Sequence, residues 1–356
     1  MMDASTGAPV ADEQANLKTL NIGIVGTGFI AGILAATIQS AGQARLTAVS
    51  SRTLGRAQAF VADYPGVEAV EGVDALLIRD DVDAVYVAAP TAAKEAVAQA
   101  ALEAGKHVLI EKPLPSSEVV ERLAALARAK GLVLMDATHF VHHPRTRVMR
   151  ERTIELIGEP RSLHTMFYFP FSDRANIRFD PAHEPMGAVG DMAWYAMRAV
   201  VEYLAPERLE DIKVIAECDP DSGAVIRATG VLKFDGARTS TFDVGYTAGA
   251  AVMDLVLAGT KGVLSQDDFV LDWRSGFGFD NPDIPTGVTH RTGMATRKDF
   301  AFIETPSSAP QHALMVDAFA DLVLSSDPSR REGWLAATAR TQSLLDAVWR
   351  NIQTSI

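Results

Sequence analysis

Between Leu20 and about Thr138, short apolar runs alternate with longer stretches of helical periodicity. Three of the four helical stretches end at a glycine, and the last begins at serines that can cap a helix. Alternating strands and helices of this kind predict a parallel sheet with helices on both faces. The predicted strands are NIGIVG, ARLTAVSSR, DAVYVAAP, HVLIEKP and LVLMDAT, and the predicted helices are FIAGILAATIQSAG, LGRAQAFVADY, AAKEAVAQAALEAG and SSEVVERLAALARAKG.

From about His139 onward, strands dominate, and several are joined by glycine or aspartate turns. A strong helix is predicted at Ala188–Leu204, and two more close the chain near Gln311–Leu324 and Trp334–Gln353. This pattern predicts a mostly antiparallel sheet with helices on one face. The predicted strands are RSLHTMFYF, IKVIAEC, AVIRATGVLKF, ARTSTFDVGYT and AVMDLVLAG, and a further helix is predicted at PRTRVMRERTIELIG.

The two patterns predict an α/β chain of two domains. A Rossmann doubly wound parallel sheet occupies residues 20–138, and an α+β domain with an open, mostly antiparallel sheet occupies residues 139–356. The polar stretch at 1–19 is predicted to be a disordered tail. The length of 356 residues agrees with two domains, because single hydrophobic cores rarely grow beyond about 250–300 residues.

The composition argues against two classes of partner, nucleic acids and membranes. The formal net charge of −12 argues against a nucleic-acid partner, since phosphate binding needs a basic face. The single cysteine, Cys218, excludes an internal disulfide and fits a reducing compartment. The N-terminal stretch has neither the basic start nor the apolar run of a signal peptide, and no run approaches about 18 apolar residues. We therefore expect a cytoplasmic protein with no membrane partner.

A glycine turn follows the first predicted strand. Gly26 permits a tight turn, Gly28 lets the backbone approach a phosphate, and the small Ala31 lets helix and strand pack closely. The helix that opens at Phe29 and Ile30 offers backbone N–H groups and a partial positive charge. A turn that serves packing alone is the alternative, but the regular series of strands and helices favours dinucleotide binding.

The end of the second strand indicates which dinucleotide is bound. An NAD site usually carries an acidic residue about 20 residues after the glycine turn, where it binds the ribose 2′-hydroxyl. Here Ser50 and Ser51 stand in that place, Arg52 follows, and Arg56 lies one helical turn further on. Serine and arginine bind a 2′-phosphate, which a carboxylate would repel. The sequence therefore predicts NADP, with NAD possible if Arg52 is only a solvated loop cation.

Two segments carry candidate catalytic groups. Glu111 and Lys112 follow a parallel strand, at the edge where α/β sheets bind ligands, and Pro113 restricts the backbone of Lys112. An ordinary ion pair on a loop is the alternative. Asp191 and Tyr195 are four residues apart on the predicted helix and so share a face; the alternative is a capping acid and a buried tyrosine. Ala89 and Pro90, at the end of the third predicted strand, are predicted to line the cofactor site with Glu111.

These motifs together resemble the glucose–fructose oxidoreductase / inositol dehydrogenase / rhizopine-catabolism (Gfo/Idh/MocA) family. The resemblance covers nearly the whole chain after residue 20, and the Glu-Lys-Pro segment is its most specific part. The segments that carry it, in chain order, are GIVGTGFIAG, SSR, EAGKHVLIEKPL, GAVGDMAWY and AGTKGVL.

The resemblance implies a nicotinamide held between the two domains. It implies that Lys112 contacts the reacting hydroxyl or carbonyl, with Asp191 at the family's acidic position. Tyr195 stands where many members carry histidine, which resembles the branch that contains dihydrodiol and xylose dehydrogenases. Lys94 replaces a histidine common in the family, and the segment 186–190 lacks its paired glycines.

The implied activity is NADP-dependent hydride transfer to or from a sugar, polyol or cyclic diol. We expect Tyr195 to act as general acid–base, with its pKa lowered from about 10 by the Lys112 cation and the oxidised nicotinamide. Asp191 is expected to hold a substrate hydroxyl or to orient Lys112. An oxidoreductase that never releases its cofactor and a non-catalytic NADP-binding regulator are the alternatives.

Four further residues are candidates for the substrate pocket. Arg178, before the catalytic helix, and His143 are predicted to contact substrate, and His142 or Arg145 are alternatives. A capping role for a histidine beside Pro144 is equally consistent with the sequence. Adjacent histidines point in different directions, so we expect no metal site. By resemblance, the chain is expected to form a homodimer or homotetramer.

Overall fold

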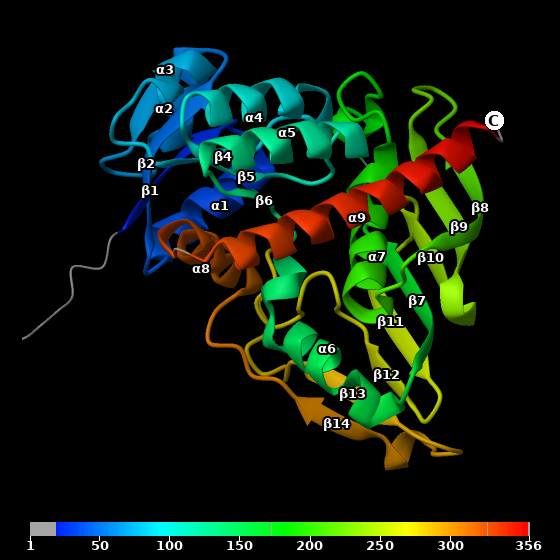
Figure 1. Cartoon of the computed structure of the whole chain (residues 1–356). Helices are drawn as coiled ribbons and strands as arrows, with labels where there is room; N and C mark the ends of the chain where they lie inside the picture. Colours follow the sequence, from blue (N-terminus) through cyan, green and yellow to red (C-terminus); the bar gives the residue numbers. More distant parts are fainter. Residues whose placement is uncertain (1–18, 172, 326, 355–356) are drawn as a thin grey trace, which may run out of the picture.

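The computed structural model describes residues 19–171, 173–325 and 327–354. Except for Thr19, the predicted tail at 1–19 lies outside the described residues. The chain forms two sheets that lie side by side, and the long helix α9 (Pro328–Gln353) runs along both of them (Figure 1). The predicted fold class, a Rossmann sheet followed by a mostly antiparallel sheet, is confirmed.

The first sheet has six parallel strands in the order β3-β2-β1-β4-β5-β6. The order reverses between β1 and β4, which creates the crevice where doubly wound sheets bind ligands. The sequence pattern did not predict β3, because this short edge strand is polar and half-exposed. The strands are β1 (Leu20–Val25), β2 (Ala44–Ser51), β3 (Glu68–Glu71), β4 (Ala84–Val87), β5 (His107–Ile110) and β6 (Leu134–Asp136).

Helices cover both faces of the first sheet (Figure 1). Ser116 caps α5 by accepting a hydrogen bond from the backbone N–H of Val119, and Gly131 ends this helix in the left-handed region. Both signals were read from the sequence. The helices of this part are α1 (Phe29–Ser40), α2 (Leu54–Val61), α3 (Val73–Leu77), α4 (Lys94–Glu103) and α5 (Ser117–Lys130).

The second sheet has eight strands in the order β14-β13-β12-β11-β7-β10-β9-β8, and only the β10–β7 pair is parallel. Along β9, buried and exposed side chains alternate, because one face packs on helices and the other faces water. The strands are β7 (Pro160–Tyr168), β8 (Leu209–Cys218), β9 (Val225–Phe234), β10 (Thr239–Gly245), β11 (Val252–Gly259), β12 (Val263–Gln266), β13 (Gly287–Arg291) and β14 (Ala301–Glu304).

The helices after residue 143 join the two sheets. Helix α6 (Pro144–Ile157) packs on β12 and β13 of the second sheet, whereas α8 (Gln311–Leu324) packs on α1, β1 and β2 of the first. Helix α9 contacts α5 and β6 as well as β8. It begins six residues before the predicted Trp334, at Pro328, after an Asp327 cap.

The predicted single α-helix at Ala188–Leu204 is wrong in detail. The segment is helical, but α7 (Trp194–Ala199) is flanked by two π-helical stretches, η4 (Val189–Ala193) and η5 (Val200–Leu204). π-Helical turns hold an extra residue and are frequent at functional sites. Almost every side chain of the segment is buried, since it lies between the second sheet and α9.

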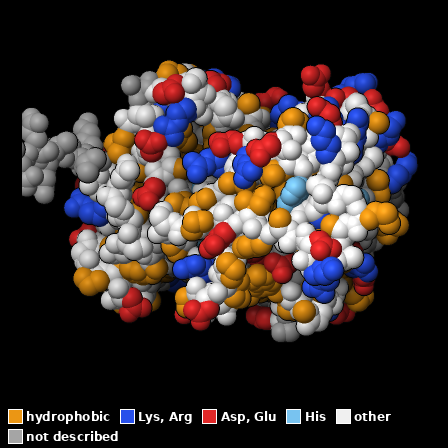
Figure 2. Space-filling view, turned by 90° about the horizontal axis from the view of Figure 1, so that it is seen from below, with side chains coloured by type: hydrophobic (Ala, Val, Ile, Leu, Met, Phe, Trp, Pro, Cys, Tyr) orange, Lys and Arg blue, Asp and Glu red, His pale blue; other side chains and the backbone are white. Residues whose placement is uncertain are grey.

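The surface mixes charges of both signs. On the face seen from below, basic and acidic side chains are interspersed among groups of hydrophobic ones (Figure 2). Cys218, at the end of β8, is a half-buried free thiol. Among the described residues, no helix combines the length and the hydropathy that crossing a bilayer requires.

Candidate active site

The turn after β1 requires a glycine and leads into a helix without a side-chain cap. Gly26 has a φ of +116°, and a Cβ placed there would lie 2.7 Å from the carbonyl oxygen of Ala88, so both conformation and space require glycine. A Cβ on Gly28 would meet nothing within 4 Å. Helix α1 then begins with no side-chain cap and no acidic residue in its first turn. Its N–H groups therefore lie beside open space, which fits the diphosphate of a dinucleotide.

This geometry predicts that the two glycines respond differently to alanine. Gly26→Ala is expected to lower the free energy of unfolding by about 1–3 kcal/mol, because it forces a strained φ and a clash with backbone. Gly28→Ala is the matched control: its φ of −83° suits any residue, so stability is expected to stay unchanged while dinucleotide affinity falls. Urea unfolding and cofactor titration of both variants check this. Equal destabilisation by the two substitutions would contradict it.

The predicted phosphate-binding residues follow β2. Ser50 is buried and its hydroxyl donates to the carbonyl of Gly72, at 2.8 Å, so it serves the fold. Ser51 is half-buried, and Arg52 and Arg56 are exposed. Neither guanidinium forms an ion pair with another described residue. Arg52 and Arg56 are therefore available to a phosphate at this edge of the sheet.

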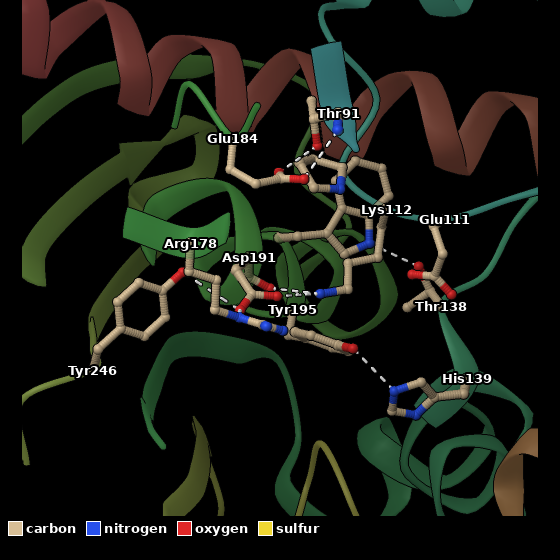
Figure 3. A network of polar contacts seen from close by, with 12 residues as sticks. Thr91, Glu111, Lys112, Thr138, His139, Arg178, Glu184, Asp191, Tyr195 and Tyr246 are labelled. Carbon is tan, nitrogen blue, oxygen red and sulfur yellow. Dashed lines mark hydrogen bonds and ion pairs between the residues drawn. The ribbon is translucent and has the colours of Figure 1, made fainter. Parts of the chain in front are cut away.

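Lys112, Asp191 and Arg178 form one charged group in which the carboxylate lies between two cations (Figure 3). The Lys112 Nζ donates to both Asp191 Oδ1 and the Asp191 carbonyl, each at 2.8 Å. The Arg178 Nε donates to Asp191 Oδ2 at 2.6 Å. Burial alone would raise the pKa of Asp191, but Arg178 and Lys112 hold it well below its usual value. Asp191 thus fixes the Lys112 ammonium, which was one of the two roles expected for it.

Tyr195 lies against this group. The Lys112 Nζ is 4.7 Å from the centroid of the Tyr195 ring, and the Tyr195 hydroxyl lies 2.9 Å from His139 Nε2 (Figure 3). Burial raises the pKa of Tyr195 to about 12, more than the Lys112 cation lowers it. For the protein's own groups, the expected lowering of this pKa is therefore wrong, because desolvation of the buried phenolate outweighs one cation. Tyr195 carries its proton at neutral pH.

Lys94 supports the backbone of the segment that carries Lys112. Its buried Nζ donates to the carbonyls of Lys112 and Pro113, at 3.0 and 2.9 Å, and to the hydroxyl of Thr91. The same hydroxyl donates to Glu184, at 2.6 Å, from the loop before Asp191. Burial lowers the pKa of Lys94 to about 8. The lysine that departs from the family pattern thus holds the backbone on both sides of the Lys112–Pro113 bond.

The lowered pKa of Lys94 predicts a pH dependence of stability. An unfolded lysine has a pKa of about 10.4, so between about pH 8 and 10 the unfolded chain binds a proton that the folded chain has released. The burial penalty is therefore full below pH 8 and is relieved as the pH rises. The unfolding free energy of the wild type minus that of Lys94→Met is expected to rise by about 1–3 kcal/mol from pH 7 to pH 10.

Urea unfolding at several pH values measures this difference. Replacing the exposed Lys213 with methionine controls for the loss of one positive charge. If the wild-type and Lys94→Met curves run parallel across the range, Lys94 does not titrate as the structure indicates.

The histidines before α6 have structural partners. His143 is buried, and its Nδ1 caps α6 by accepting from the backbone N–H of Arg145 at 3.2 Å. Burial lowers the pKa of His143 to about 3. His142 stacks on Trp334, and Arg145 pairs with Asp268 at 2.6 Å. His143 thus caps α6, which is one of the roles that the sequence left open. A contact between His143 and the substrate stays a prediction.

Sequence reasoning missed three residues of the site: His139, Gln311 and Glu184. His139 follows β6, at the same edge of the sheet as Lys112. Because parallel sheets bind ligands at the carboxyl ends of their strands, this position could have indicated His139 from the sequence. No local signal pointed to Gln311, which reaches His139 across 172 positions of sequence. In the described part of the chain, His, Cys, Asp and Glu side chains form no group of three or more able to hold a metal ion.

Comparison with known proteins adds the following similarities. A family model described as "Oxidoreductase family, NAD-binding Rossmann fold" matches residues 20–138. The dTDP-3,4-didehydro-2,6-dideoxy-alpha-D-glucose 3-reductase of Actinomadura kijaniata is 33% identical over 340 residues, which cover 95% of this chain and 97% of the relative. The scyllo-inositol 2-dehydrogenase (NADP(+)) IolU of Bacillus subtilis is 30% identical over 227 residues, or 61% of this chain and 67% of the relative.

A solved structure agrees over nearly the full length. KijD10, a 3-ketoreductase from Actinomadura kijaniata in complex with NADP and TDP-benzene, superposes with a TM-score of 0.83 at 30% identity. The match covers 94% of this chain and 98% of KijD10.

Proposed function

Since the chain belongs to the Gfo/Idh/MocA family of NAD(P)-dependent oxidoreductases, which act on sugar-like substrates, we propose that it reduces a ketone on a nucleotide-linked sugar with NADPH. One observation carries the proposal: the Tyr195 ring lies 4.7 Å from the Lys112 Nζ, which is paired with Asp191 at the edge of the sheet. The choice of a nucleotide-linked ketone is supported by the full-length relative, a dTDP-sugar 3-reductase, and by KijD10.

Separate groups of residues would bind the cofactor and transfer the proton. The glycine turn and the first turn of α1 would hold the diphosphate, and Ser51 and Arg52 the 2′-phosphate. When bound, the reduced nicotinamide supplies the hydride to the ketone carbon. Tyr195 gives its proton to the ketone oxygen, while the Lys112 ammonium, fixed by Asp191, stabilises the developing negative charge. Arg178 also pairs with Asp191, so the three side chains together carry one net positive charge.

The protonation state of Tyr195 suits catalysis of ketone reduction at neutral pH. An acid whose pKa lies near 12 is protonated throughout the neutral range and is ready to donate. Oxidation of an alcohol would instead require the phenolate, which burial disfavours. We therefore infer that the chain works as a reductase at neutral pH, and that oxidation of the product becomes faster as the pH rises.

The 2′-phosphate assignment predicts a change in cofactor preference. Arg52→Ala is expected to raise the KM for NADPH about tenfold and to leave the KM for NADH unchanged, because one charge-assisted hydrogen bond is lost. Arg79→Ala, which removes a surface arginine paired with Asp81, is the control. Initial rates with both cofactors measure the effect. An equal change for NADPH and NADH would mean that Arg52 does not read the phosphate.

The direct test uses purified protein, NADPH and a panel of substrates. A dTDP-linked 3-ketosugar is compared with free aldoses and inosose, and alcohols of each class are offered with NADP⁺. Turnover of the dTDP-ketosugar, with a product that has gained two hydrogens by mass spectrometry, supports the proposal. Turnover of free sugars or inositols alone would replace it with a dehydrogenase of the IolU type. Purified protein that already carries nicotinamide and exchanges none would indicate a non-dissociating cofactor.

A further inference from the structure

We infer that Gln311 fixes His139 as the tautomer with its proton on Nε2, so that His139 donates a hydrogen bond to the Tyr195 oxygen and stabilises the phenolate formed during catalysis. This inference rests on the proposed role of Tyr195 as proton donor. It assigns a catalytic role to His139, which touches the reacting oxygen, and a positioning role to Gln311.

The three side chains form a buried chain of contacts. His139 begins the short helix η2 (His139–His142), and its Nε2 lies 2.9 Å from the Tyr195 hydroxyl oxygen. Gln311 is the first residue of α8, and its Nε2 lies 2.6 Å from His139 Nδ1. The same Nε2 lies 2.5 Å from the carbonyl oxygen of Val270. All three side chains are at most 5% exposed.

The direction of each hydrogen bond follows from the Val270 carbonyl. A carbonyl only accepts, so the Gln311 amide must present its nitrogen, and not its oxygen, to Val270. The second hydrogen of that nitrogen then points to His139 Nδ1, which must accept and is therefore unprotonated. A neutral imidazole without a proton on Nδ1 carries it on Nε2.

The surroundings keep the ring neutral and in place. Burial and the neighbouring His312, Lys112 and His142 hold the pKa of His139 well below its ordinary value. The His312 ring packs on the His139 ring with centroids 4.2 Å apart. His139 is thus an N–H donor throughout the neutral range and not a base.

This arrangement frees the proton of Tyr195 for the substrate. Because His139 donates to the Tyr195 oxygen, the tyrosine hydrogen is not used between them. When that hydrogen passes to the ketone oxygen, the O–H bond of Tyr195 breaks, and the charge left on the phenolate is met by the His139 N–H and the Lys112 ammonium. No proton has to move onto His139. The titratable groups that face Tyr195 are Lys112, Glu111, Asp191, His139 and Tyr86.

The tautomer is measurable without turnover. We would label the histidines of the full chain with ¹⁵N and assign His139 by its absence from the spectrum of His139→Gln. The expected result is a protonated Nε2 and a bare Nδ1 in the wild type, with this preference lost in Gln311→Met. A wild-type ring protonated on Nδ1 would overturn the inference.

The catalytic consequence is tested with two substitutions at the same site. His139→Leu removes the donor and is expected to lower kcat roughly ten- to a hundredfold, the range for a hydrogen bond to a charged group, with little change in KM. His139→Gln keeps an N–H near the position of Nε2 and is expected to restore kcat to within a few-fold. In the oxidation direction, the rising limb of the pH–rate profile should move to higher pH in His139→Leu alone.

The outcomes separate this inference from the proposed function. A purely structural role would impair both His139 variants equally and leave the pH–rate profile in place, which would overturn the inference. A His139→Leu variant with the kcat of the wild type would also overturn the inference. If the wild type itself reduces no ketosugar, the proposed function fails, and the ¹⁵N spectra still decide whether Gln311 sets the tautomer.

Discussion

Tyr195→Phe is expected to lower kcat for ketone reduction by about a hundredfold or more, the usual contribution of a positioned general acid. The substitution keeps the ring that packs beside Lys112 and removes only the hydroxyl that carries the proton. Substrate and cofactor binding should change little, since the loss falls on the transition state. Steady-state rates and a fluorescence titration with NADPH separate these two effects.

Tyr203→Phe is the matched control for this prediction. Tyr203 is also buried, but its hydroxyl donates to Thr146, away from Lys112 and Asp191. The kcat of Tyr203→Phe should stay within a few-fold of the wild-type value. If Tyr195→Phe did the same, the acid–base role would be wrong, and Lys112 would become the remaining proton donor at the site.

The second large effect concerns stability. Arg198→Leu is expected to lower the free energy of unfolding by about 3–5 kcal/mol, because it leaves the buried Asp136 carboxylate without its cation and removes the buried one of the two arginines that pair with Glu202. The Arg198 Nη1 lies 3.1 Å from Asp136 Oδ2 and its Nε lies 2.8 Å from Glu202 Oε1, with all three side chains at most 7% exposed. Asp136 ends β6 of the first sheet, so this ion group ties α7 to that sheet.

Urea unfolding of Arg198→Leu measures the effect, with Arg152→Met as the comparison. Arg152 pairs with Glu155 on the exposed face of α6, and exposed pairs contribute little. The control should therefore unfold like the wild type. A loss of less than about 1 kcal/mol in Arg198→Leu would show that the Asp136 carboxylate tolerates the absence of Arg198, contrary to the usual cost of a broken buried pair.

The sequence predicted a strand well where the strand is apolar and its neighbours in the chain are polar. The strands that form the middle of the first sheet are continuous apolar runs, and each was predicted close to its observed bounds. Strands β3 and β14 lie at sheet edges with mostly half-exposed or exposed side chains, so the pattern that marks a buried strand is absent from them. The π-helical turns around α7 also leave no periodicity distinct from that of a buried α-helix.

Some residues of the candidate site were predicted from the sequence, whereas others became evident only from the structure. Lys112, Asp191 and Tyr195 were predicted from motifs, and the structure brings them together; their catalytic roles stay predictions. For the protein's own groups, the predicted lowering of the Tyr195 pKa was wrong, because the sequence reveals a nearby cation but not the extent of burial that opposes it. Gln311 lies far from His139 in sequence, so only the folded chain shows their contact.

The position of α8 bears on how this protein is made. Met315, Val316 and Phe319 of α8 lie in one hydrophobic core with β1 and α1, although α8 follows every strand of the second sheet in the sequence. A nascent chain that has emerged only as far as residue 138 has all six strands of its first sheet but leaves that core partly uncovered. The Rossmann unit is therefore completed only once α8 has been synthesised, and an expression fragment that stops at residue 138 would lack part of its own core.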